Sequence, residues 1–143
     1  MANRLKIARL LLSLPALFLA IGPPFVDLNA SHVLNPLWSG HARLHRVWLI
    51  TTNSLISLVA LWLLWRSAPG ALRRSVHLAG VLVGAVLLGF FVAGGTQALY
   101  GGSFTDPNGI AQTVGGFDLN LAVFSLLFLV VVSAMVLGRE YPA

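Results

Sequence analysis

The chain has 143 residues, of which 57% are hydrophobic and only 9% charged, and its mean hydropathy is +0.86. So few charged side chains cannot cover the surface of a water-soluble domain, and the composition therefore excludes an ordinary soluble fold. Nine Lys and Arg oppose four acids, and they lie in short clusters beside apolar runs, a pattern typical of membrane proteins rather than of nucleic-acid binding. The sequence has no cysteine, which excludes disulfides, thiolate metal sites and cysteine nucleophiles.

Four apolar runs follow one another at residues 5–25, 47–65, 76–100 and 119–137. Each is close to the roughly 20 residues that an α-helix needs to cross the hydrocarbon of a bilayer. Backbone N–H and C=O groups must be satisfied internally there, and the runs are continuous rather than alternating, so they predict helices and not a β-barrel. We therefore predict one domain over residues 1–143, an all-α four-helix transmembrane bundle.

In the first run, three basic residues at positions 4–9 precede the apolar core Leu10 to Ile21, a pattern that also fits a signal peptide. No small-x-small cleavage site follows its apolar core, so a retained helix is the better interpretation. Pro15 is expected to kink this helix, and Pro23-Pro24 to end it or bend it sharply.

The orientation follows from the distribution of Lys and Arg. Seven of the nine lie at the N-terminus, in the second connection and at the C-terminus, and two lie in the first connection. The positive-inside rule places the richer side in the cytoplasm, so both chain ends are predicted inside (N-in/C-in). The first and third connections then face outward.

The two outward segments, residues 27–48 and 101–120, carry three of the four histidines and three of the four acids. They are longer than simple turns, and their ionisable groups alternate with Leu, Val, Trp and Phe. We expect both loops to be structured, to fold back on the bundle and to line an outward-facing polar pocket.

His41 and His45 are four residues apart, which places both imidazoles on one face if a helix begins near Ser39. One interpretation is a metal site or a His/Asp acid–base pair. The other is structural, with these residues capping helix ends, bonding loop carbonyls and pairing Arg43 or Arg46 with Asp118.

The candidate site divides into two sets. The candidate catalytic residues are His41, His45, Asp27 and Asp118, and the candidate ligand contacts are Asn29, His32, Asn35, Trp38, Arg43, Trp48, Asn53 and Gln97. Asp118 also suits a helix cap, and the deep Asn53 and Gln97 suit either a ligand or an interhelical hydrogen bond. A divalent metal at His32, His41 and His45 is a minor alternative.

The stretch Asp27-x-Asn29-x-x-His32-x-x-Asn35-Pro-x-Trp38-x-x-His41-Ala-Arg43-x-His45-x-x-Trp48 resembles the signature of small four-span membrane proteins to which no activity is attached. In plan the chain is also similar to emopamil-binding-type sterol isomerases, which place His and acidic residues in a small helical membrane pocket. Those proteins use glutamates within the spans, whereas the single glutamate here is Glu140 at the tail. No residue role is therefore carried over. Histidine-box desaturases need more than the four histidines present.

These features lead to one main functional hypothesis: an integral protein, expected in a bacterial inner membrane, that binds and potentially transforms a lipid-like or apolar small molecule at its outward mouth. One alternative is an accessory or assembly subunit that docks on a membrane-protein partner. Another is a small transporter formed as a homo-oligomer, although charge within the spans is scarce.

Overall fold

The protein is an all-α four-helix bundle, as the sequence predicts. A computed structural model describes residues 2–104, 113–114 and 116–139. Its long helices are α1 (Ala2–Asp27), α2 (Gly40–Arg66), α3 (Leu72–Thr96) and α4 (Leu119–Leu137). All four are long and apolar enough to cross a membrane.

Short elements join the helices. The 3₁₀ turn η1 (Pro69–Ala71) connects α2 to α3, and η2 (Gln97–Leu99) extends the end of α3. Strands β1 (Thr113–Val114) and β2 (Phe117–Asp118) pair antiparallel just before α4. In the third connection, residues 105–112, which include Asp106, lie outside the described residues.

Helix α2 begins at Gly40, well before the apolar run at residue 47, because polar residues can extend a helix beyond the hydrocarbon. Ser39 is its N-cap, and the side-chain oxygen of Ser39 accepts a hydrogen bond from the backbone N–H of Ala42 at 3.1 Å. Helix α4 occupies the predicted residues.

Of the two expected effects of Pro23-Pro24, the end of the first helix is wrong, because α1 continues to Asp27. Proline removes its own N–H but keeps its carbonyl, and three of the last four carbonyls of this helix find donors in the first connection. The Leu28 N–H donates to Pro24 at 3.2 Å, the Asn29 side-chain amide to Val26 at 2.6 Å, and the Val33 N–H to Asp27 at 3.1 Å.

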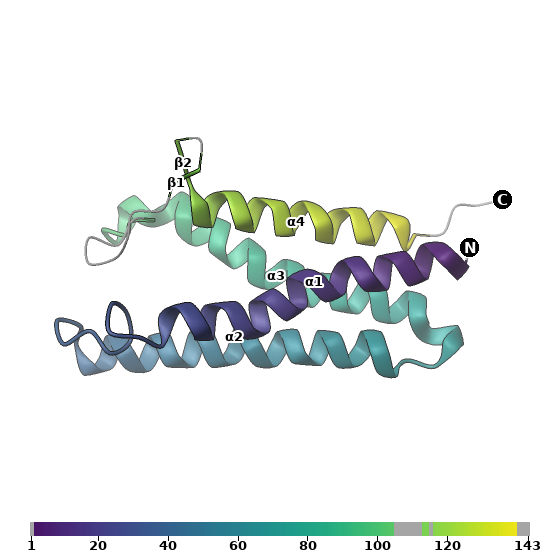
Figure 1. The fold of residues 1–143 in the computed structure, drawn as a ribbon, viewed down its shortest axis with the longest axis horizontal. Coiled ribbons are helices and arrows are strands. Elements are labelled where there is room, and N and C mark those ends of the chain that lie inside the picture. Colours follow the sequence, from purple (N-terminus) through teal and green to yellow (C-terminus); the bar gives the residue numbers. More distant parts are fainter. Residues whose placement is uncertain (1, 105–112, 115, 140–143) are drawn as a thin grey trace.

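Helices α1 and α3 cross near the centre of the bundle, with α2 and α4 on the two flanks (Figure 1). Helix α1 packs against all three other helices, whereas α2 and α4 do not pack against each other in the described part of the chain. The start of α1 and the end of α4 lie at the same end of the bundle (Figure 1). The first and third connections lie at the opposite end, which we call the outward end on the strength of the predicted orientation.

Small and branched apolar residues fill the core at helical spacing, and they come from every helix: Ala8, Leu12, Ala16, Leu19, Ala60, Leu64, Val76, Ala79, Val83, Leu87, Val131 and Ala134. Glycine allows α3 to approach α4 closely. A Cβ at Gly80 would lie 2.6 Å from Cγ of Met135, and one at Gly84 would lie 3.7 Å from Val131. The Gly80-x-x-x-Gly84 pattern therefore serves packing within the bundle.

Candidate functional site

The connection between α1 and α2 folds into a compact cap, which we call loop one (residues 28–39). Its turns are held by two asparagine side chains. The Asn29 Oδ1 accepts hydrogen bonds from the N–H groups of Ser31 at 3.0 Å and His32 at 3.2 Å. Asn35 is buried, and its Oδ1 accepts from the Leu37 N–H at 2.9 Å while its Nδ2 donates to the Ser31 carbonyl at 3.3 Å. Both asparagines are therefore engaged in folding the loop.

Asp27 joins three parts of the outward end. Its carboxylate is buried at the last residue of α1, and Nη2 of Arg46 on α2 donates to Oδ2 at 2.7 Å. The Nε2 of His32 in loop one lies 3.9 Å from Oδ1. The negative end of a helix dipole is unfavourable for a carboxylate, so the guanidinium of Arg46 compensates this position and fastens α1 to α2.

Arg43 holds the second half of loop one against the first turns of α2. Its Nε and Nη2 donate to the Trp38 carbonyl at 3.1 and 3.0 Å, and Nη2 also donates to the Pro36 carbonyl at 3.4 Å. The Trp38 ring lies edge-on to the His32 ring, with the centroids 6.3 Å apart. Arg43 and Trp38 therefore belong to the folded loop.

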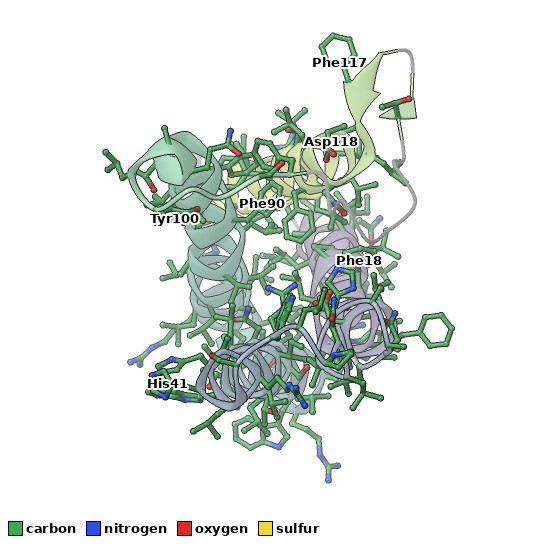
Figure 2. All side chains as sticks on the ribbon, turned by 90° about the vertical axis from the view of Figure 1, so that its left-hand side faces the viewer. Phe18, His41, Phe90, Tyr100, Phe117 and Asp118 are labelled. Atoms are coloured by element: carbon green, nitrogen blue, oxygen red, sulfur yellow. The ribbon has the colours of Figure 1, made fainter. Side chains whose placement is uncertain are left out.

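Three aromatic residues form a ladder on the exposed flank of α2. The Nε2 atoms of His41 and His45 are 3.0 Å apart in a hydrogen bond, and the His45 ring lies 5.8 Å from that of Trp48. This confirms that the two histidines share one face of a helix. Figure 2 shows His41 on the outside of the bundle, away from the labelled Phe18.

Asp118 lies elsewhere at the outward end. It caps α4, because its Oδ1 accepts a hydrogen bond from the Leu121 N–H at 3.1 Å. In the end view of Figure 2, Asp118 lies beside the β-hairpin, on the opposite side of the bundle from His41. The structure therefore does not bring Asp118 to the histidines. The expected pairing of Asp118 with Arg43 or Arg46 is also wrong, because those guanidinium groups bond the loop-one carbonyls and Asp27.

Asn53 and Gln97 lie away from loop one. Asn53 is half-buried on α2, beside the hydroxyls of Ser54 and Ser57, which are buried without a partner in the described part of the chain. Gln97 starts η2, and its backbone carbonyl accepts from the N–H groups of Tyr100 and Gly102. Neither lies on loop one or on the aromatic ladder.

A cluster of phenylalanines at the outward end is not evident in the sequence. The rings of Phe90 on α3 and Phe124 on α4 stack with centroids 4.0 Å apart, and Phe18 on α1 meets Phe124 edge-on at 6.2 Å. Figure 2 shows Phe18 and Phe90 between the α3/α4 pair and the α1/α2 pair. The pair Phe124 and Phe128, four residues apart, was a sequence signal for one such face, but its partners lie on other spans.

The three histidines of the minor metal alternative are not gathered in one place. His32 lies with Asp27 and Trp38, whereas His41 pairs with His45. Within the described residues, no group of three or more His, Cys, Asp and Glu side chains is close enough to hold a metal ion.

The bundle and its folded outward cap define a small four-helix membrane protein. Residues 11–138 match the model of a family of unknown function (DUF6640), and the chain belongs to that family. The match includes loop one, the whole of α2, α3 and α4, and α1 from residue 11 onward. Comparisons with curated proteins and with solved structures give no match.

Proposed function

We propose that this protein binds an amphipathic, lipid-like molecule at its outward end, with the apolar part against the phenylalanine cluster and the polar part near loop one. The observation that carries the proposal is the convergence of Phe18, Phe90 and Phe124 from three different helices. Phe18 is 38% exposed although its ring contacts Phe124. Phe18 lies in the membrane-spanning part of α1, so its exposed side faces lipid, and we propose that an apolar ligand reaches the cluster from there.

The distance between Asp27 and Phe18 along the axis of α1 suits a molecule with a polar head and an apolar tail. Asp27 and Phe18 are nine residues apart on one helix, which corresponds to roughly 14 Å along its axis. Polar groups of loop one, such as the half-buried His32, therefore lie at one level and the rings at a deeper one. Ligand sites commonly combine an apolar lining with a few polar groups in this way.

The geometry favours binding over chemistry. Asp27 is ion-paired with Arg46, and Asp118 caps α4, so neither carboxylate is poised as a free acid or base. His41 lies on the outer flank of α2 rather than beside the rings (Figure 2), and His45 is hydrogen-bonded to it. We propose a bacterial inner membrane as the location, with the binding end facing away from the cytoplasm.

The test is native mass spectrometry of the purified protein in detergent, which detects lipid that remains bound. Phe124→Ala removes the ring that contacts both Phe18 and Phe90. We expect it to lower lipid occupancy by roughly tenfold, because less apolar surface is buried against the lipid. Phe25→Ala is the matched control, because Phe25 lies on α1 but is 84% exposed. Unchanged occupancy in a folded Phe124→Ala variant would remove the cluster from the proposed site.

A second candidate function is that of an accessory subunit docked on another membrane protein. Loop one presents Leu34 and Leu37 with 64% and 82% of their areas exposed, outside the membrane-spanning part of the chain. Exposed apolar side chains in a folded loop are typical of docking surfaces. Recovery of a stoichiometric membrane protein instead of lipid in the same spectra would favour this function.

A further inference from the structure

His41 and His45 lie on the outward flank of α2 and have no role in folding loop one. Their Nε2 atoms are 3.0 Å apart and both side chains are exposed. The Trp48 ring lies against His45 on the next turn, which limits the rotation of that imidazole. Two ring nitrogens are thus held close together at a surface that small solutes can reach.

We propose that His41 and His45 together bind one divalent transition-metal ion of the Cu²⁺ or Ni²⁺ type. Metal–imidazole bonds are about 2.0–2.1 Å long. Two such bonds meeting at a right angle place the nitrogens about 2.9 Å apart, whereas a tetrahedral angle places them about 3.4 Å apart. The observed 3.0 Å is close to the right-angle value of tetragonal Cu²⁺ and Ni²⁺ sites, so binding of these ions requires the least movement of the two rings.

The same distance serves a hydrogen bond in the metal-free protein, where one ring donates its Nε2–H to the other ring. When a metal binds, the donor ring moves that proton to Nδ1, and both Nε2 lone pairs then face the ion. The change is a shift of tautomer within an exposed ring, so the pair needs no rearrangement of the helix.

The neighbouring positive charges are directed elsewhere. Arg43 bonds the carbonyls of Pro36 and Trp38, and Arg46 bonds the buried Asp27. No third His, Cys, Asp or Glu joins the pair within the described residues, so the remaining coordination positions belong to water or to donors of a ligand. We therefore expect an open, exchangeable site whose affinity follows the order Cu²⁺ above Ni²⁺ above Mn²⁺.

The experiment is a titration of the full-length protein, purified without a histidine tag, with Cu²⁺ alone, followed by electron paramagnetic resonance. We expect one bound Cu²⁺ with hyperfine splitting from two nitrogen ligands. His41→Ala and His45→Ala should each weaken binding by at least about tenfold, because each removes one of two coordinate bonds.

Two controls separate chelation from a mere count of histidines. His77→Ala removes a histidine of α3 and should leave the signal intact. Combining His45→Ala with Ala42→His restores four histidines but places the two imidazoles about 100° apart around the helix, and the two-nitrogen signal should be lost. Circular dichroism verifies folding. An unchanged signal in the His41→Ala/His45→Ala double variant, or in the displaced pair, would overturn the proposal.

Discussion

Asp27 is the last residue of α1, and its buried carboxylate lies at the helix end toward which the backbone carbonyls point. The guanidinium of Arg46 on α2 compensates this negative charge. The contact joins residues that are 19 positions apart and spans the whole of loop one. It therefore fixes how α1 and α2 meet at the outward end. Asn29, Asn35 and Arg43 then shape the loop between these anchors through bonds to its backbone.

Replacing Asp27 with Asn removes the charge but keeps the shape, and we expect the free energy of unfolding to fall by about 1.5–3 kcal/mol, the usual contribution of a hydrogen bond to a charged group. Unfolding by SDS in mixed micelles measures this change. Asp118→Asn is the matched control, because asparagine caps helices as well as aspartate does and little change is expected. Equal losses for both variants would contradict the special role of Asp27.

At this scale the sequence predicted the shared face of His41 and His45, because helical spacing alone determines it. It did not predict the partner of Arg46. Asp27 and Asp118 were both available as acids, and the choice depends on how far loop one lies from the start of α4, which local spacing does not encode.

At the scale of the helices, glycine decides how closely α3 approaches α4. Gly80 faces Met135 so closely that a side chain there would collide with it, whereas a Cβ added at Gly89 on the same helix would meet no atom within 4 Å. The two glycines therefore serve different purposes.

Helix bounds were predictable wherever hydrocarbon sets them, as for α4. The start of α2 was less predictable because it depends on the Ser39 cap. The end of α1 was less predictable because donors in loop one satisfy carbonyls of its last turn.

Gly80→Ala should lower the free energy of unfolding by about 1–3 kcal/mol, because the extra methyl group must displace Met135. Gly89→Ala meets no neighbour and replaces glycine with a better helix former, so we expect no loss. The comparison of the two midpoints in the same SDS titration tests the contact. A Gly80→Ala variant as stable as Gly89→Ala would show that the interface yields without cost.

At the scale of the molecule, the number of spans was predictable from composition, but the arrangement of the helices was not. Which helices lie side by side depends on matching of side-chain shapes across the bundle, and the crossing of α1 and α3 leaves no local pattern in either segment. The phenylalanine cluster went unrecognised for the same reason. The start of α1 and the end of α4 lie at the same end of the bundle, which agrees with an even number of spans (Figure 1).

The predicted orientation can be tested without removing any native thiol, because the sequence contains no cysteine. Ala30 in loop one and Ala68 between α2 and η1 are both exposed and suit single substitutions to cysteine. In intact spheroplasts, a membrane-impermeant maleimide should label Ala30→Cys and should label Ala68→Cys only after lysis. The reverse pattern would invert the molecule in the membrane.

The contact of α1 with α4 has a consequence for biosynthesis. Helix α1 is synthesised before α4, so this contact can form only after α4 has been inserted. Until then, part of the apolar stripe of Ala8, Leu12 and Ala16, fully covered in the finished bundle, must rest against lipid or an insertion factor. Closure of this protein is thus a late event that follows translation of the fourth span.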